Sequence, residues 1–264
     1  MPASEAAKPA LLSIDGGVAE LVLNRPEKLN AMNLAMVHDL AEGLQAAVAG
    51  NARALLVRGE GRAFCSGRDL ADADPLNEDG ESILRDILNP LIEGMAAVPI
   101  PTIAAVQGAC LGTGLGFALA CDVVYAADDA RIGSPFARIG AVLDSGAHAA
   151  FVSRIGPHRA LELVYTGRLL SGREAADWGL VNRSVAGADL LRRTRELAAT
   201  IANGPTAAFR ESKQIVRAIL DDQLSFTDVL AAEAEAQGRA SRTHDYRDGI
   251  SAFQEKRKPS FTGR

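Results

Sequence analysis

Short apolar runs alternate with longer segments of helical spacing through the first half of the chain. Residues 11–15 and 18–23 alternate apolar and polar positions around Gly16-Gly17, which predicts a β-hairpin. The same pattern predicts further strands at 54–57 and 102–106, and helices at 34–48, 83–97 and 115–121. Strands alternating with helices through residue 127 favour an α/β layer over a helical bundle.

The last third of the chain changes in character, because nearly all of it has helical spacing. The predicted helices are 147–155, 159–166, 173–178, 190–202, 206–220, 226–241 and 246–256. Only residues 181–184 there predict a strand. We therefore expect a core over residues 10–200, a helical C-terminal region over 201–264, and a disordered tail over residues 1–9.

Composition narrows the class of protein. With 264 residues and 48% hydrophobic content, the chain can bury a core as one domain. A net charge of −5, with both signs interspersed, gives no basic face for nucleic acid. No run of apolar residues predicts a signal peptide or a membrane span. Three cysteines without metal-ligand spacing predict reduced thiols, no metal site and a cytoplasmic location.

Two glycine-containing loops each follow a predicted strand and precede a possible helix start. One is the 64–70 loop, and the other is the turn around Gly112 and Gly114. Unpaired N–H groups at a helix start favour negative charge, and two such donors converging on one oxygen would form an oxyanion hole. Glycine-rich turns also serve tight packing alone. No Lys-Ser/Thr follows the glycines, which disfavours a phosphate loop.

Asp144 stands in a stretch that is otherwise short of charge. In one interpretation its carboxylate moves a proton near the glycine turn. In the other, it caps a helix that begins near Ser145, as Asp often does. The residues by themselves leave both interpretations open.

Several segments together resemble, in order, the crotonase or enoyl-CoA hydratase/isomerase superfamily, over about residues 11–264. The matching segments are Asn24-Arg-Pro-Glu-Lys-Leu-Asn-Ala-Met, Phe64-Cys-Ser-Gly-Arg-Asp-Leu, Ala105-Val-Gln-Gly-Ala-Cys-Leu-Gly-Thr-Gly, Ala120-Cys-Asp, Tyr165-Thr-Gly-Arg, Ala175-Ala-Asp-Trp-Gly-Leu-Val and Phe253-Gln-Glu-Lys-Arg-Lys-Pro. The resemblance implies an α/β fold, a crotonase-like spiral of ββα units with a helical C-terminal trimerisation region. It also implies a homotrimer or homohexamer.

The resemblance further implies an acyl-CoA substrate, with no cofactor besides that coenzyme A thioester. In such proteins two backbone N–H groups stabilise a thioester enolate, and by motif these belong to Arg68 and Thr113. Arg68 stands where many relatives have alanine, so its side chain is also expected to line the pocket or meet the ligand. The residues implied in substrate and CoA binding are Lys28, Ser66, Gly67, Asp69, Leu70, Gly112, Gly114, Phe136, Phe253 and Lys256.

Departures from the family pattern point to one activity. Hydratases of this superfamily carry two glutamates that work on water, and those positions here are Gly116 and Phe136. The stretch around Asp144-Ser-Gly instead looks like the isomerase branch that relies on one aspartate, which includes 1,2-epoxyphenylacetyl-CoA isomerases. We therefore expect Asp144 to act as the acid/base of a double-bond shift. The alternatives are a hydratase of low activity, a 4-chlorobenzoyl-CoA dehalogenase-like hydrolase and a non-catalytic acyl-CoA-binding protein.

Overall fold

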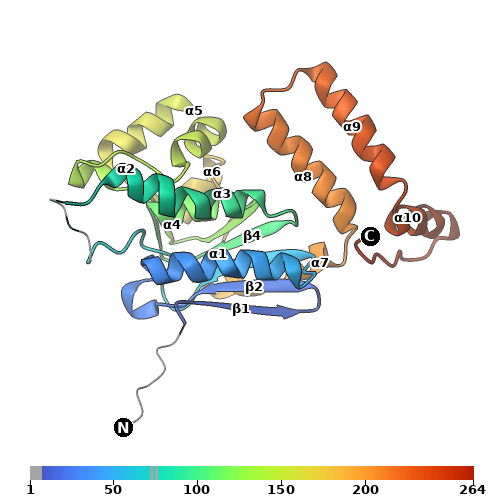
Figure 1. Ribbon diagram of the computed structural model, residues 1–264, viewed down its shortest axis with the longest axis horizontal. Helices are drawn as coiled ribbons and strands as arrows, with labels where there is room; N and C mark the ends of the chain where they lie inside the picture. The colour runs from blue at the N-terminus through green and yellow to red at the C-terminus, as the bar shows by residue number, and fades with distance from the viewer. Residues whose placement is uncertain (1–7, 72–73, 75–76) are drawn as a thin grey trace, which may run out of the picture.

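The computed structural model describes residues 8–71, 74 and 77–264 (Figure 1). The tail predicted at residues 1–9 therefore lies mostly outside the described residues. At its end, the carbonyls of Lys8 and Pro9 accept hydrogen bonds from Asn24. No helix in the described part of the chain is long and apolar enough to cross a membrane.

A six-stranded sheet forms the centre of the molecule, in the order β1-β2-β3-β4-β6-β9. Its strands are β1 (Ala10–Asp15), β2 (Val18–Leu23), β3 (Ala54–Gly59), β4 (Thr102–Val106), β6 (Val123–Ala127) and β9 (Arg183–Val185). β1 and β2 pair antiparallel as the predicted hairpin, and all other neighbours in this sheet are parallel. β4 is buried at every position, as expected for a strand covered on both faces.

A second, smaller sheet was missed by the sequence patterns. It consists of β5 (Ala109–Leu111), β7 (Arg131–Gly133) and β8 (Leu170–Ser171). The prediction of a single strand in the last third is thus wrong, because β8 is too short to show any alternation. Two passes of the chain through the large sheet enter the small one before the next α-helix: β4 and β5 lead to α4 (Thr113–Leu119), and β6 and β7 lead to α5 (Ala147–Thr166). This repetition is the ββα spiral that the resemblance implied.

Helices cover the sheets largely where the spacing predicts them. The predicted 83–97 helix is divided into α2 (Gly80–Ile83), a π-helical segment (Leu84–Leu88) and α3 (Asn89–Ala97). α5 contains both helices predicted at 147–155 and 159–166. They are separated by a kink, because Gly156, at φ 78°, is not helical and is followed by Pro157. The remaining helices of this part are α1 (Leu34–Ala49), α6 (Gly172–Asp177) and α7 (Gly187–Ala202), all confirming predicted segments to within a few residues.

The last three helices form an arm that projects from the core (Figure 1). They are α8 (Thr206–Asp221), α9 (Phe226–Ala240) and α10 (His244–Glu255). α7 still packs on β3, β4 and β6, so the arm proper begins with α8. Lys213 of α8 reaches Asp122 at 2.7 Å, and Asp122 also accepts from the backbone and hydroxyl of Thr102. Asp122 therefore links the arm to the central sheet.

Arg53 provides a second link between core and arm. Its guanidinium donates to the hydroxyl of Thr206, to the carbonyl of Gly204 and to the carbonyl of Phe261 near the C-terminus. Because these bonds carry a charge and are partly buried, Arg53→Ala is expected to lower the free energy of unfolding by about 2–3 kcal/mol. Urea denaturation followed by circular dichroism measures this. An equal loss in Arg62→Ala, at an exposed arginine, would contradict the assignment.

Candidate functional site

Two backbone segments meet at the start of α4. The N–H of Cys65 donates to the carbonyl of Ala109, and the N–H of Leu111 donates to the carbonyl of Cys65, both at 2.9 Å. Gly67, at φ 100°, lies so close that a Cβ there would be 3.1 Å from the Leu111 carbonyl oxygen. The two glycine-containing loops singled out in the sequence are thus packed against each other.

Two backbone N–H groups at this junction have no hydrogen-bond acceptor within the described part of the chain. Among the residues that the structure describes, no hydrogen bond is found for the N–H of Arg68, although its neighbours Gly67 and Asp69 both bond to Met32. Thr113 is the first residue of α4, where an N–H has no partner within the helix. Both groups are available to an oxygen of a ligand.

Asp144 lies in the loop between the turn at Phe136–Ile139 and α5, and is half-buried. Its Oδ1 accepts a hydrogen bond of 2.8 Å from the Ser145 hydroxyl. Burial raises the pKa of the Asp144 carboxyl above its ordinary value, while that hydrogen bond and the charges of Arg68 and His148 act to lower it. A carboxyl with a raised pKa is a stronger base when ionised.

The capping interpretation of Asp144 is wrong. α5 has Gly146 at its N-cap, in the left-handed conformation, and no side chain caps it. Of the groups of Asp144, only the backbone carbonyl bonds to α5, where it accepts a hydrogen bond from the N–H of Ala147. Ser145, also left-handed at φ 56°, turns the chain so that the Asp144 carboxylate is free of the helix end.

Gly116 brings the loop of Asp144 against α4. A Cβ at Gly116 would lie 2.2 Å from the Ser145 carbonyl oxygen and 2.4 Å from the Ser145 Cβ. In hydratases of the superfamily that the chain resembles, this position carries a glutamate. Here the space that such a side chain would need is occupied by the backbone of the loop that carries Asp144. Phe136, at the second such position, is half-buried with its ring beside Gly112.

Gly114 has a packing role. A Cβ there would lie 2.5 Å from the Cβ of Cys65, so the residue allows α4 to approach the 64–70 loop. Gly114→Ala is expected to destabilise the protein by about 1–3 kcal/mol. Gly94→Ala is the matched control, since α3 leaves 3.9 Å there, and it is expected to stabilise the helix by up to about 1 kcal/mol. Thermal unfolding of both variants tests this, and equal melting temperatures would contradict it.

Several of the predicted binding residues lie beside these loops. The Ser66 hydroxyl is 3.4 Å from the carbonyl oxygen of Lys28, and Asp69 forms an ion pair of 3.0 Å with Arg25. The hydrogen bond from the N–H of Ala71, and to a lesser extent that pairing, hold the pKa of Asp69 below its ordinary value. Lys28 and Leu70 are exposed. The structure therefore places Lys28, Ser66 and Asp69 on adjoining segments next to Gly67.

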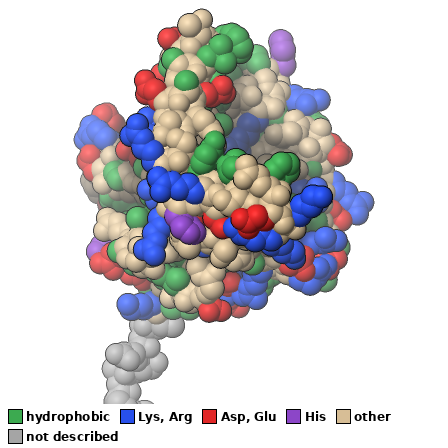
Figure 2. Space-filling model, turned by 90° about the vertical axis from the view of Figure 1, so that its right-hand side faces the viewer, with side chains coloured by type: hydrophobic (Ala, Val, Ile, Leu, Met, Phe, Trp, Pro, Cys, Tyr) green, Lys and Arg blue, Asp and Glu red, His purple; other side chains and the backbone are tan. Residues whose placement is uncertain are grey.

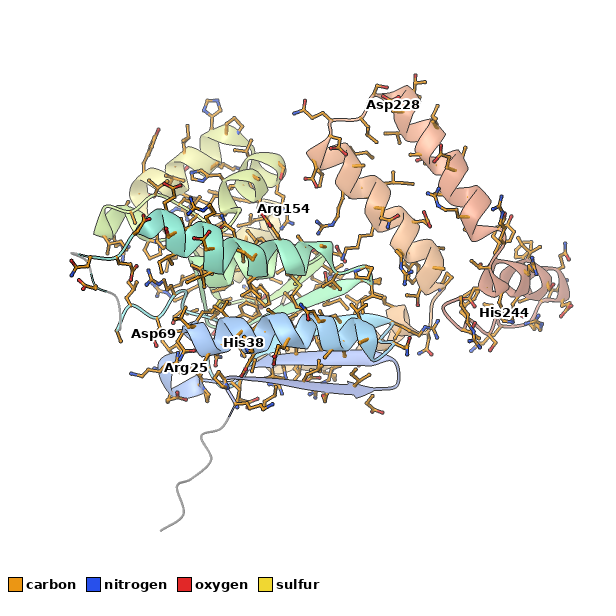
Figure 3. All side chains as sticks on the ribbon, viewed as in Figure 1. Arg25, His38, Asp69, Arg154, Asp228 and His244 are labelled. Carbon is orange, nitrogen blue, oxygen red and sulfur yellow. The ribbon has the colours of Figure 1, made fainter. Side chains whose placement is uncertain are left out.

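Phe253 and Lys256 do not join the site within one chain. Both belong to the end of α10, where Phe253 is 86% exposed and Lys256 ends the helix in a left-handed conformation. Figure 3 shows Arg25 and Asp69 at one end of the molecule and His244, at the start of α10, at the other. Within one chain, Phe253 and Lys256 therefore lie far from the two glycine-containing loops.

One residue beside the site was missed by the sequence reasoning. Glu78 forms a two-pronged ion pair with the Arg68 side chain. It stands in an acidic stretch whose charges look like a solvated loop, so its spacing from Arg68 carries no periodic signal. The sequence offers one signal that could have indicated this pair. A positive side chain stands next to a predicted oxyanion-hole donor, and acidic residues follow about ten positions later.

Other reactive groups lie away from Asp144. The thiols of Cys65, Cys110 and Cys121 are free and buried, and burial raises the pKa of Cys65 and of Cys121 to about 12, which makes them poor nucleophiles. His38, Asp39 and Glu42 on α1 have ligand atoms within 4.8 Å of one another, but these residues lie on an exposed face of the helix.

The predicted cytoplasmic location and the predicted absence of a metal remain predictions.

The fold and the site define an α/β protein in which two backbone donors at a glycine turn lie near a half-buried carboxylate loop. Comparison with known proteins agrees, since the family model for enoyl-CoA hydratase/isomerase matches residues 13–264. The chain belongs to this family, of the crotonase superfamily, and is an enzyme of that family.

The relatives that follow span nearly the full length of the chain. The chain is 41% identical over 251 residues to a protein of Rhodobacter capsulatus named "Probable enoyl-CoA hydratase", covering 95% of this chain and 96% of that protein. It is 36% identical to the 1,2-epoxyphenylacetyl-CoA isomerase of Escherichia coli, covering 96% and 98%. The crystal structure of an enoyl-CoA hydratase from Bacillus anthracis superposes with a TM-score of 0.90 at 30% identity, covering 97% of this chain and 100% of that chain. The predicted fold class is thereby confirmed.

Proposed function

We propose that this enzyme shifts a double bond within an unsaturated acyl-CoA, with Asp144 as the acid/base. The observation that carries the proposal is the single half-buried carboxylate on the loop that packs against α4. At the start of the same helix, the N–H groups of Arg68 and Thr113 lack acceptors among the described residues. The relative named 1,2-epoxyphenylacetyl-CoA isomerase supports an isomerisation of a CoA thioester in general.

The mechanism uses an oxyanion hole and one carboxylate. The N–H groups of Arg68 and Thr113 donate to the thioester carbonyl oxygen, which lowers the energy of the enolate. For a 3-enoyl thioester, ionised Asp144 takes a proton from the α-carbon, and the electron pair moves onto the carbonyl oxygen. Protonated Asp144 then returns the proton to the γ-carbon as the enolate collapses. The double bond moves by one position, no atom is gained or lost, and no metal or redox cofactor is needed.

Hydration is the second candidate, because relatives such as the Rhodobacter capsulatus and Bacillus anthracis proteins are named hydratases. It requires groups that orient and deprotonate water. Gly116 has no side chain for this, and the ring of Phe136 has no acid–base group. The site chemistry therefore favours isomerisation. The dehalogenase-like and non-catalytic alternatives have no comparable support.

Binding of coenzyme A is proposed at the segment of Lys28, Ser66 and Asp69, next to the acyl site. Phe253 and Lys256 would contribute from a neighbouring subunit, in a homotrimer or homohexamer. The arm supports such an assembly, because Val216, Leu220, Phe226 and Phe253 expose apolar side chains there. Figure 2, which faces the side of α9 and α10, shows hydrophobic side chains exposed beside Lys and Arg. A cavity of about 960 Å³ lies between α8 and the core.

A panel of CoA thioesters tests the proposed function. Purified protein is incubated with 2-enoyl, 3-enoyl, ring-containing and chlorobenzoyl thioesters, and the products are separated by mass spectrometry and chromatography. Isomerisation gives a new retention time at unchanged mass, hydration adds one water, and the dehalogenase-like reaction releases chloride. Mass-neutral products are expected. Hydration or chloride release as the main reaction, or binding without any turnover, would refute the proposal.

A further inference from the structure

Residues 257–264 fold back along α10 and are bonded to two of its carboxylates. The N–H of Thr262 and the N–H of Gly263 donate to the two carboxylate oxygens of Asp245, at 2.6 and 2.7 Å. The hydroxyl of Thr262 also donates to Asp245, at 3.2 Å. Further along α10, Asp248 accepts a hydrogen bond of 2.6 Å from the N–H of Ser260. The C-terminal segment is therefore fastened to α10 through charged acceptors.

The carboxylate of Asp245 is built into this contact, because its side chain is only 1% exposed. A buried carboxylate is costly unless it is hydrogen-bonded. Burial acts to raise the pKa of Asp245, but the N–H groups of Thr262 and Gly263, together with His244 and the Thr262 hydroxyl, hold that pKa below its ordinary value. Asp245 is therefore ionised at neutral pH, and its hydrogen bonds are of the stronger, charge-assisted kind.

The same segment also contacts the core. The carbonyl of Phe261 accepts a hydrogen bond of 3.0 Å from Nη1 of Arg53, which precedes β3. A Cβ at Gly263 would lie 3.2 Å from Nε of Arg53 and 3.3 Å from the hydroxyl oxygen of Thr206, at the start of α8. Residues 261–263 thus lie between the start of α10 and these two core-side groups. In the described part of the chain no other helix or strand packs extensively on α10, so this segment ties α10 to the core.

We propose that Asp245 is a positioning residue, which clasps residues 260–264 against Arg53 and thereby fixes the direction of α10 relative to the core. α10 carries Phe253 and Lys256, which the proposed function assigns to coenzyme A held by a neighbouring subunit. The clasp holds both side chains in one orientation, and its consequence for the reaction rests on the proposed function. Contacts to the coenzyme are the same in substrate and transition state, so loss of the clasp raises KM without lowering kcat.

Spin labels on α1 and α10 measure the direction of α10. The native cysteines Cys65, Cys110 and Cys121 are buried, so labels attach at Gln45→Cys and Gln254→Cys, which are two exposed positions. Dilution with an excess of unlabelled protein leaves only the distance within one chain. Double electron–electron resonance should then give one narrow distance distribution when the clasp is intact.

Two variants open the clasp from opposite sides. In Asp245→Ala the N–H groups of the C-terminal segment lose their acceptor, so the distance distribution should broaden and its mean should shift. Deletion of residues 261–264 removes the other half of the clasp and should give the same broadening, even if Asp245→Ala folds poorly. Asp228→Ala is the matched control, because Asp228 also lies in the first turn of its helix and its described bonds are all to Ser225. It should keep the narrow distribution.

The kinetic consequence is measured on the same variants without labels. The KM for an acyl-CoA should rise about tenfold in Asp245→Ala, while kcat stays within about twofold of the wild type. Asp228→Ala should change neither quantity.

Unchanged distance distributions in both clasp variants, or equal broadening in Asp228→Ala, would overturn the inference. Broadened distributions with an unchanged KM would also overturn it, because the direction of α10 would then have no bearing on substrate binding. Absence of isomerisation in the wild-type protein would refute the proposed function instead. The spin-label distances, with calorimetric titration of acyl-CoA in place of KM, still decide the inference in that case, so the two failures are distinguishable.

Discussion

Replacement of Asp144 by asparagine should abolish most of the isomerase activity while leaving the protein folded and able to bind acyl-CoA. The amide cannot take a proton from carbon, and acid–base catalysis by a positioned group contributes about 10²–10⁴-fold to turnover. Asparagine has nearly the same shape, and its Oδ1 can still accept the hydrogen bond from the Ser145 hydroxyl. The loss is therefore expected in kcat, with little change in the dissociation constant of an acyl-CoA. Steady-state kinetics and calorimetric titration measure the two quantities.

The same variant should not lose stability at neutral pH. Burial raises the folded-state pKa of Asp144, so the folded protein favours the protonated form. The contribution of this group to stability consequently falls as pH rises through that pKa, and an uncharged asparagine avoids the loss. A melting temperature at or above that of the wild type is expected. Asp129→Asn, at an exposed aspartate, is the matched control and should keep full activity. Unchanged turnover in Asp144→Asn would remove Asp144 from the mechanism.

Restoring the hydratase glutamate at Gly116 should destroy activity rather than convert it. Any side chain there begins with a Cβ 2.2 Å from the Ser145 carbonyl oxygen, which is backbone and cannot rotate away. The loop that carries Asp144 must therefore move, and a displacement of about 1 Å near the reacting atoms can cost about 10²-fold in rate. Gly116→Glu is expected to lose isomerisation by at least that factor and to show no hydration of a 2-enoyl-CoA.

Gly94→Glu is the matched control for Gly116→Glu, because a Cβ at this exposed position of α3 would meet no atom closer than 3.9 Å. It should keep wild-type isomerisation and thermal stability. Gly116→Ala separates the clash from the charge, since its Cβ alone meets Ser145, and it should lose activity as well. A Gly116→Glu protein that hydrates 2-enoyl-CoA at a measurable rate would show that the loop can accommodate the side chain. It would contradict the role given to Gly116.

The sequence predicted the large elements because each of them has its own periodicity. The hairpin of β1 and β2, the buried strand β4 and the helices of the last third follow directly from apolar spacing, and the fold class follows from their order. The motif order identified the family. β5, β7 and β8 were not predicted as strands, since segments of two or three residues have no period to detect and pair only through neighbours distant in sequence.

Residue chemistry singled out candidate site residues but did not decide between their roles. For Asp144, helix capping and proton transfer use the same side chain, and only the left-handed turn at Ser145 and Gly146 rules out the cap. For Gly114, close packing and ligand contact both require glycine, and the Cβ position against Cys65 shows the packing. These decisions depend on distances between segments far apart in the chain.

By itself, then, the sequence determined the α/β class, the helical C-terminal third and the family, because those depend on local periodicity and on the order of motifs. Only the tertiary structure decided that the loop of Asp144 occupies the space beside Gly116, that Glu78 holds Arg68, and that α10 lies far from the glycine loops. The physical reason is that packing and ion pairing are contacts in space, and a one-dimensional pattern records none of them.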